Sequence, residues 1–291
     1  MGVLRRDFLL GVALSTAAAP ARGDDEPLVE HDLLLDGKYA RRARVYLPRR
    51  PAKTGTWPLL VLLHGLGETG NEQLGIRAWG ELYGLKSAYG RLVHPPISKT
   101  LPKRSYLTDE HLARLNASLS KRPFQDVAVA CPVTPNPYKL QPAARTLDEY
   151  AEWLEHALLP AVRKLGPITA EPRRTGLDGC SLGGYVGVEV FLRKPQLFGS
   201  FGGVQSAFGV PMALQYAERM AQAIRRVGPR AVRVGSSTED PYRRANEALS
   251  QRLTELQVPH VLSVLPGPHN QPWLREVGTL DMLLWHARQL R

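Results

Sequence analysis

Three side chains in the second half of the chain, Ser181, Asp240 and His269, have the types that nucleophilic catalysis requires. A serine hydroxyl is a weak nucleophile until a base takes its proton. An imidazole does this near neutral pH when a carboxylate fixes its tautomer and stabilises its positive form. If the fold brings these three groups together, the chemistry they predict is acyl transfer through a covalent intermediate on Ser181.

Ser181 is the centre of a Gly-x-Ser-x-Gly motif, Gly179-Cys180-Ser181-Leu182-Gly183. Residues 174–178 before it predict a short strand, and residues 185–193 after it predict a buried helix that ends before a proline. At such a corner the serine occupies a strained turn, and glycines two places on either side avoid clashes with the neighbouring chain. The motif alone also fits a helix-capping serine in a glycine-rich turn, so its surroundings decide between the two interpretations.

A second informative stretch is His64-Gly65-Leu66-Gly67, which follows a continuous apolar run typical of a central strand. Acyl transfer needs two donors aimed at the oxyanion of the tetrahedral intermediate, and a glycine-rich loop beside the serine turn supplies them from its backbone. We assign these donors to the N–H groups of Leu66 and Leu182. His64 is then expected to pack under the loop, not to act as the base.

Strand and helix patterns alternate along residues 27–291 and predict one α/β domain with a mostly parallel, doubly wound sheet. Residues 28–35 and 39–47 flank the turn signal Asp36-Gly37 and predict an antiparallel hairpin. Later strands are predicted at 57–65, 126–131, 174–178, 197–206, 230–235 and 260–265. Helices are predicted from a capping box at Thr146, and at 185–193, 212–226, 243–256 and 273–290. The carboxyl ends of such strands carry Ser181, Asp240 and His269, which predicts that the three residues meet.

The stretch from about residue 68 to 125 is longer than a connection between two central strands requires. It predicts a cap-like insertion at the ligand end of the sheet, which either walls the substrate site or covers the fold without touching substrate. Trp79 and His94 within it are candidates for substrate contact. Trp273, near the candidate base, is a further one, with packing as the alternative.

The first 21 residues predict a twin-arginine signal peptide, with Arg5-Arg6, an apolar run over residues 8–19 and a small-residue cleavage site at Ala19-Pro20-Ala21. The apolar run is too short for a permanent membrane span. We therefore expect a periplasmic or secreted bacterial protein without a stable membrane anchor. The alternative is a frayed helix at the start of a cytoplasmic protein.

The formal net charge of +11 comes mostly from arginines that are scattered along the chain. A nucleic-acid-binding protein would concentrate this charge on one face or carry a recognisable module, so no nucleic-acid partner is expected. The histidines show no metal-binding spacing, and neither a metal nor an organic cofactor is expected. Those outside the motifs are predicted to be structural: His31, His111, His156, His260 and His286.

Taken together, these motifs resemble an α/β-hydrolase family. The residues that carry the resemblance are the two glycine-rich motifs, Pro195-Gln196-Leu197-Phe198, Asp240, and His269 followed by Trp273. The family contains esterase D (S-formylglutathione hydrolase), feruloyl and acetyl-xylan esterases, enterochelin esterases and mycolyltransferases. The resemblance spans roughly residues 28–290 and implies the α/β-hydrolase fold. Residues 68–125 match no named relative.

The resemblance and the residues together predict a serine esterase, a carboxylic-ester hydrolase in which Ser181 forms an acyl-enzyme, His269 is the base and Asp240 orients it. The substrate would be a small-molecule or glycan-linked ester. One alternative passes the acyl group to a glycan or another alcohol. Another is a catalytically inactive protein that binds envelope polysaccharide.

In the strand order that the resemblance implies, the strand ending at His64 lies between the strands that carry Cys131 and Cys180. Two strand spacings of about 4.8 Å separate the cysteines by more than the roughly 7 Å that a disulfide tolerates. Both thiols are therefore expected to be free and buried.

Overall fold

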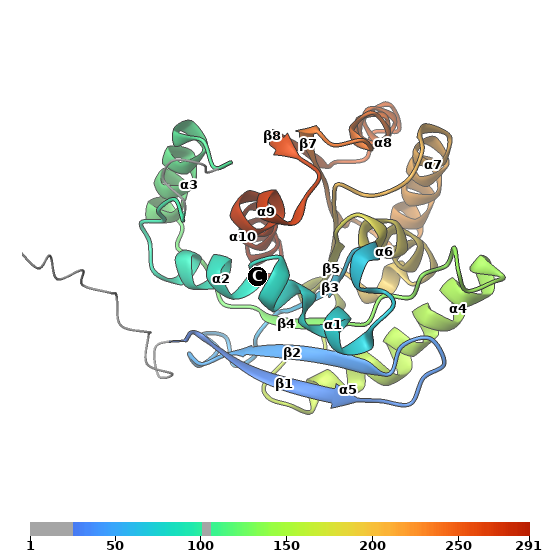
Figure 1. The fold of residues 1–291 in the computed structure, drawn as a ribbon, viewed down its shortest axis with the longest axis horizontal. Helices are drawn as coiled ribbons and strands as arrows, with labels where there is room; N and C mark the ends of the chain where they lie inside the picture. The colour runs from blue at the N-terminus through green and yellow to red at the C-terminus, as the bar shows by residue number, and fades with distance from the viewer. Residues whose placement is uncertain (1–25, 101–105) are drawn as a thin grey trace, which may run out of the picture.

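In the computed structural model, which describes residues 26–100 and 106–291, eight strands form one sheet with helices on both faces (Figure 1). The signal peptide expected at residues 1–21 lies outside the described residues. The strands are β1 (Leu28–Leu34), β2 (Arg42–Pro48), β3 (Leu59–Leu63), β4 (Ala128–Pro132), β5 (Thr175–Gly179), β6 (Ser200–Val204), β7 (Ala231–Glu239) and β8 (Val261–Pro268).

Helical segments connect the strands. The α-helices are α1 (Glu72–Arg77), α2 (Leu85–Val93), α3 (Asp109–Lys121), α4 (Ala143–Trp153), α5 (Leu159–Arg163), α6 (Leu182–Arg193), α7 (Val210–Val227), α8 (Arg243–Glu255), α9 (Gln271–Trp273) and α10 (Thr279–Gln289). Short 3-10 or π turns complete the set: η1 (Leu66–Glu68), η2 (Ala78–Leu82), η3 (Leu154–Leu158), η4 (Pro172–Arg174), η5 (Pro195–Leu197) and η6 (Leu274–Gly278). No helix in the described part of the chain is long and apolar enough to cross a membrane.

The strand order is β1-β2-β4-β3-β5-β6-β7-β8. β1 pairs antiparallel with β2 and β2 antiparallel with β4, whereas every pairing from β4 onward along the sheet is parallel. The expected α/β-hydrolase fold, with its N-terminal antiparallel hairpin and mostly parallel sheet, is therefore confirmed. Because β3, β5, β7 and β8 run in one direction, the residues that follow them meet at one edge.

The alternation of side chains along β3 shows how the sheet divides the core. Leu59, Val61 and Leu63 belong to one hydrophobic cluster, and Leu60 and Leu62 belong to another. Successive side chains of a strand point to opposite faces, so a strand covered on both sides must be apolar throughout. This is why residues 59–63 read as an uninterrupted apolar run.

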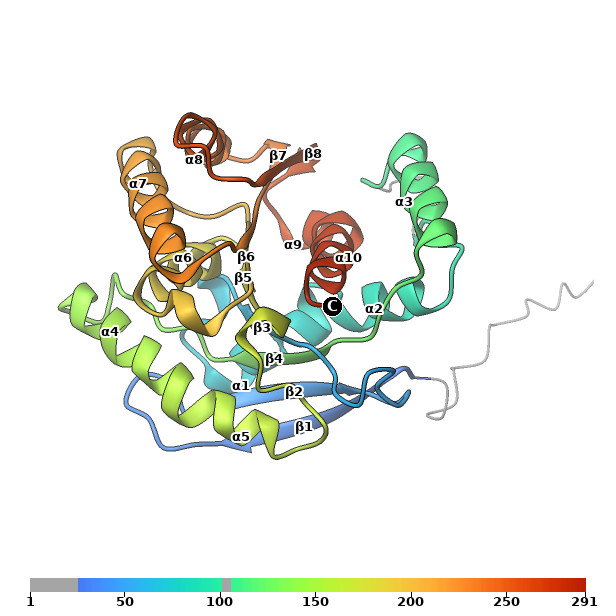
Figure 2. The same cartoon turned by 180° about the vertical axis from the view of Figure 1, so that it is seen from behind.

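Different helices cover the two faces. α4, α6, α7 and α8 contribute to the first cluster, and α2, α3 and α10 contribute to the second. Figures 1 and 2 show this arrangement from the front and from behind, with α2 and α10 on one side of the sheet and α4 to α7 on the other. The helix α6, which follows the serine motif, is buried along most of its length because it lies between the sheet and α4 and α7.

The structure describes most of the expected cap-like stretch, apart from residues 101–105, as helical. Its first part packs onto the sheet: Ala78, Trp79, Leu85 and Tyr89 are fully buried in the cluster that includes α10. The role of this stretch as a lid stays a prediction, but much of it serves as core.

One boundary expectation is wrong. Thr146 does not open a helix, because α4 already begins at Ala143, directly after Pro142. Pro142 is the N-cap residue, and its carbonyl accepts a helical hydrogen bond from the Thr146 N–H (3.1 Å). Thr146 lies a turn inside and donates its hydroxyl to the Leu140 carbonyl (3.0 Å) instead of capping.

Strand β7 runs four residues beyond the expected position 235, to Glu239, and pairs with β8 as far as Pro268. The last paired residues, Glu239 and Pro268, directly precede Asp240 and His269. The extended pairing is what sets the acid and the base side by side.

The cysteines are free and buried, as expected. Cys131 is in β4 and Cys180 follows β5, and β3 lies between those two strands. Burial raises the pKa of both thiols well above the usual value, so neither is an activated thiolate.

Candidate active site

Ser181 occupies a strained turn between β5 and α6. Its φ of 55° and ψ of −117° lie in a region that residues with a side chain rarely adopt. The flanking glycines permit this turn: a Cβ on Gly179 would lie 2.3 Å from the Gly183 carbonyl oxygen, and one on Gly183 would lie 2.2 Å from that of Leu63. The motif therefore forms the elbow that its spacing predicted, and not a capping turn, since the Ser181 side chain caps no helix N–H.

The structure brings Ser181, His269 and Asp240 into one chain of hydrogen bonds. Ser181 Oγ lies 3.0 Å from His269 Nε2, and His269 Nδ1 lies 2.8 Å from Asp240 Oδ1. Because a carboxylate only accepts, Nδ1 carries the proton and donates it to Asp240. Nε2 is then left to accept from the Ser181 hydroxyl, which is the tautomer that a general base requires.

Asp240, not its neighbour Glu239, is the acid in this chain. The Asp240 side chain is fully buried (0 %), whereas Glu239 is exposed. Besides His269, the carboxylate accepts from the Ser236 hydroxyl (2.7 Å) and from the Tyr242 N–H (3.0 Å). These three donors fix both oxygens and leave the carboxylate no freedom to turn away from the imidazole.

Two backbone N–H groups are available as oxyanion donors. Leu66 starts the turn η1 after β3, and Leu182 starts α6. Among the hydrogen bonds of the described residues, neither N–H has a protein acceptor, as is usual for the first N–H groups of a helix. The positive end of the α6 dipole adds to the attraction for a negative oxygen at this position.

His64 packs under the loop, as expected, and is fully buried. Its Nε2 accepts from the Thr134 N–H (2.9 Å), so Nδ1 carries the proton and donates to the Gly65 carbonyl (2.9 Å). Burial lowers the pKa of His64 to about 4. The neutral ring thus holds the loop that carries Leu66.

A cavity of about 210 Å³ opens onto Ser181 and His269. Four of its lining residues were not anticipated from the sequence: Glu68, Tyr83, Gln205 and Gln271. They come from four separate parts of the chain and belong to no motif. Gln205 has a positive φ of 52° directly after β6, and its side-chain amide donates to Ser237 Oγ (2.6 Å) and the Pro268 carbonyl (3.1 Å). The predicted strand over residues 197–206 includes Gln205, so its place directly after β6 is seen only in the structure.

The three residues expected to contact substrate do not line this cavity. Trp79 is fully buried and packs edge-on against Tyr83, with ring centroids 5.2 Å apart. Trp273 is 1 % exposed and donates its indole N–H to the Pro266 carbonyl (2.8 Å). His94 is exposed at the end of α2. The two tryptophans are core residues because their large apolar rings gain more from burial than from a position on the cavity wall.

A second serine, histidine and aspartate also form a hydrogen-bonded chain. His286 Nε2 lies 2.9 Å from Asp178 Oδ2, and its Nδ1 lies 2.9 Å from Ser200 Oγ. All three side chains have 0 % exposure. Ser200 is the first residue of β6, so it lies toward the amino end of a strand, away from the edge where ligands bind. We interpret this chain as a tie that anchors α10 to β5 and β6.

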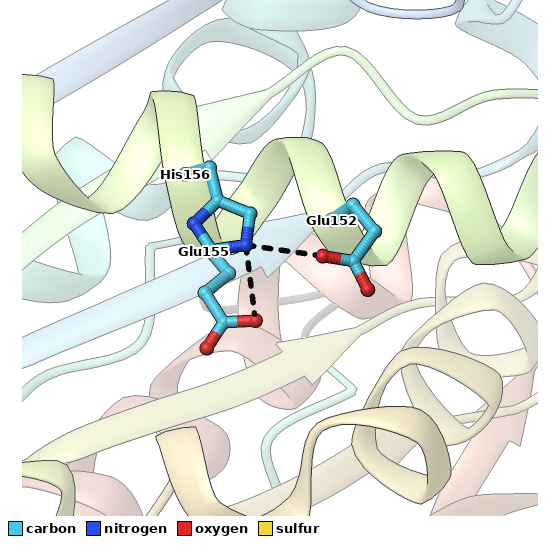
Figure 3. Close-up of side chains that lie close together, drawn as sticks. All are labelled: Glu152, Glu155 and His156. Atoms are coloured by element: carbon cyan, nitrogen blue, oxygen red, sulfur yellow. Dashed lines mark hydrogen bonds and ion pairs between the residues drawn. The ribbon is translucent and has the colours of Figure 1, made fainter.

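One group of side chains in the described residues has the composition of a metal site: Glu152, Glu155 and His156 (Figure 3). The imidazole Nε2 lies 3.1 Å from Glu152 and 3.7 Å from Glu155 on the same helical face. The Lys194 ammonium already pairs with both carboxylates at 2.6 Å. Because a cation of the chain already pairs with both carboxylates, the cluster gives no reason to infer a metal ion.

No protein-family model and no curated protein sequence matches the chain. Solved structures do match it over nearly its whole length. A ferulic acid esterase aligns with 91 % of this chain and 98 % of its own, at a TM-score of 0.64 and 17 % identity. An S-formylglutathione hydrolase from Staphylococcus aureus aligns with 89 % of this chain and 96 % of its own, at a TM-score of 0.57 and 13 % identity.

The enterobactin esterase of Shigella flexneri aligns with 94 % of this chain and 61 % of its own, at a TM-score of 0.57 and 15 % identity. These proteins belong to esterase classes that the sequence motifs of this chain resemble. At such identities the likeness concerns the fold: the chain has the fold of esterase-like serine hydrolases.

Proposed function

We propose that this protein is a serine carboxylic-ester hydrolase that forms an acyl-enzyme on Ser181. The observation that carries the proposal is the hydrogen-bonded chain from Ser181 Oγ through His269 to Asp240, which opens onto a cavity beside two N–H groups that have no protein acceptor in the described structure. The esterase fold shared with the solved structures supports the same reaction class.

In the first half of the proposed reaction, His269 Nε2 takes the Ser181 proton as Oγ attacks the ester carbonyl. The carbonyl oxygen becomes an oxyanion that accepts from the Leu66 and Leu182 N–H groups. Asp240 stabilises the imidazolium without taking its proton. The imidazolium then gives the proton to the departing alkoxide, and the alcohol leaves an acyl group bonded to Oγ.

In the second half, His269 takes a proton from water as the water oxygen attacks the acyl carbon. The oxyanion forms at the same two N–H groups and collapses, which breaks the bond to Oγ and returns the proton to Ser181. The products are a carboxylic acid and the free enzyme. No metal or organic cofactor enters either half.

The cavity volume favours small groups at the reacting centre. About 210 Å³ is below the roughly 300–1,000 Å³ of pockets that enclose drug-sized ligands. We therefore propose short acyl or alcohol groups in the cavity, with any larger part of the substrate outside it.

A panel of esters tests the proposal. Initial rates would be compared for p-nitrophenyl esters from acetyl to decanoyl, for methyl ferulate and for an acetylated sugar, with product analysis in water and with added alcohol or glycan. Hydrolysis of short-chain esters that disappears in Ser181→Ala would support it. Acyl transfer in preference to hydrolysis would identify an acyltransferase instead, and no turnover of any ester would refute an esterase.

We also propose export of the protein, on the strength of Arg5-Arg6 and the apolar run that follows. This rests on the sequence alone.

A further inference from the structure

The cavity at Ser181 contains a charge of the opposite sign to that of the whole protein. Lysine and arginine outnumber aspartate and glutamate by 38 to 27 in the sequence. Among the described residues that line the cavity, however, the only Asp, Glu, Lys or Arg is Glu68. A ligand in this cavity therefore meets an acidic side chain within a basic protein.

Glu68 is 4 % exposed and is held from two sides. The Tyr83 hydroxyl donates to Oε2, and the Gln271 amide donates to Oε1 (3.2 Å). Tyr83 in turn accepts from the Gly65 N–H (3.2 Å), so its own proton is free to point at Glu68. Each carboxyl oxygen thus has one hydrogen-bond partner, and both partners are uncharged.

No cation of the described chain neutralises this carboxylate. Its hydrogen bonds come from a neutral phenol and a neutral amide, and Glu68 takes part in none of the ion pairs of the described residues. Burial raises the pKa of Tyr83, so the phenol keeps its proton and supplies no charge. Buried carboxylates are normally paired, because desolvation of an unpaired charge is costly.

We propose that Glu68 is a specificity residue that selects esters carrying a positively charged ammonium group on the part that enters the cavity. This inference rests on the proposed ester hydrolysis at Ser181 and names a substrate class for it. An ammonium group would supply the missing counter-charge in a site where little water screens the attraction. A carboxylate or phosphate on the same part of the substrate would be repelled.

Glu68 also has a structural alternative, since its bonds to Tyr83 and Gln271 join the loop of Leu66 to the loop of His269. A purely positioning role would change the turnover of all esters by a similar factor. A specificity role changes the ratio between charged and neutral esters, and this ratio is the quantity to measure.

The test compares esters of matched shape that differ in charge, with kcat/KM measured by pH-stat titration at pH 7. On the acyl side, methyl 3-aminopropanoate is cationic, methyl butanoate is neutral and monomethyl succinate is anionic. On the alcohol side, acetylcholine is cationic and 3,3-dimethylbutyl acetate is its neutral analogue. Glu68→Gln keeps the shape and removes the charge, and Glu72→Gln, at a half-exposed position on α1, is the matched control.

We expect kcat/KM of the cationic ester to be about tenfold or more above that of its neutral partner, on the acyl side, the alcohol side or both. This factor is the equivalent of one modest charge pair. The anionic ester should be the poorest, Glu68→Gln should bring the ratio close to one, and Glu72→Gln should leave it unchanged. Equal rates for cationic and neutral esters on both sides, or a preference that survives Glu68→Gln, would overturn the inference while leaving the esterase intact.

A second measurement uses only the wild-type protein and a single covalent modification, so it depends neither on catalytic turnover nor on the folding of a variant. The wild-type protein would be treated with two fluorophosphonates that differ only in a choline or a 3,3-dimethylbutyl alcohol, and the rate of Ser181 modification would be recorded. Faster reaction of the choline compound supports the inference, and equal or slower reaction contradicts a cationic site on the alcohol side. Failure of both compounds to modify Ser181 would refute the proposed function, and the inference with it.

Discussion

Replacing Asp240 by asparagine changes one buried group and leaves the shape of the site almost unaltered. Asp240 accepts from His269, from the Ser236 hydroxyl and from the Tyr242 N–H. In Asp240→Asn, either the amide N–H₂ faces His269 and forces the proton onto Nε2, or the amide oxygen faces it and the negative charge is missing. The first tautomer cannot accept the Ser181 proton, and the second arrangement loses stabilisation of the imidazolium.

The size of the expected loss in kcat follows from the burial of the carboxylate that Asp240 presents to His269. The Asp240 carboxylate is fully buried, 2.8 Å from His269 Nδ1, so solvent does not screen the loss. Replacement of the acid of a serine–histidine–aspartate triad typically lowers kcat by about ten-thousandfold, or about 5 kcal/mol of activation free energy. We expect a loss of this order for p-nitrophenyl acetate hydrolysis, with KM changed far less.

Glu239→Gln is the matched control, because this neighbouring carboxylate is exposed and takes no part in the chain. It should retain near wild-type kcat. Thermal unfolding of both variants separates catalysis from stability. Asp240→Asn activity within tenfold of wild type, in a folded protein, would refute the assignment, and so would a crippled Glu239→Gln.

Three further predictions concern stability, thiols and export. Burial lowers the pKa of His64 from 6.5 to about 4, so as the pH falls the unfolded state takes up a proton on this residue before the folded state does. The free energy of unfolding should therefore decrease between pH 6.5 and 4, by up to about 3 kcal/mol from this residue. Urea titrations of His64→Gln should show a free energy of unfolding that depends less steeply on pH. Alkylation of the denatured, unreduced protein should modify both Cys131 and Cys180, whereas a mass lower by two protons with neither alkylated would reveal a disulfide. Replacing Arg5 and Arg6 together by lysine should leave the protein in the cytoplasm of a bacterial host, and unchanged export by cell fractionation would contradict a twin-arginine signal.

The parts of the site that the sequence predicts are those that a local rule governs. Ser181 needs a turn that only flanking glycines allow, and Asp240 and His269 follow strands whose patterns are legible. The parallel sheet then brings three distant residues to one edge. Local rules also mislead, since Thr146 has the pattern of a capping box but Pro142 starts the helix earlier.

The cavity wall was not predictable in the same way. Glu68 in η1, Tyr83 directly after η2 and Gln271 in α9 come together through tertiary packing, and no pattern in the sequence relates them. Trp79 and Trp273 attract attention as binding residues because of their size, yet the same size drives them into the core. The buried chain of Ser200, His286 and Asp178 likewise depends on α10 packing across β5 and β6.

Covalent labelling tests the central claim most directly, because the described residues form two serine–histidine–aspartate arrangements: that of Ser181 opens onto a cavity, and that of Ser200 is fully buried. The protein would be treated with a fluorophosphonate, digested, and analysed by mass spectrometry, with Ser181→Ala and Ser200→Ala as the paired variants. We predict modification of Ser181 in the wild type and in Ser200→Ala, and none in Ser181→Ala, together with loss of ester hydrolysis in that variant. Modification of Ser200, or hydrolysis at the wild-type rate in Ser181→Ala, would contradict the mechanism.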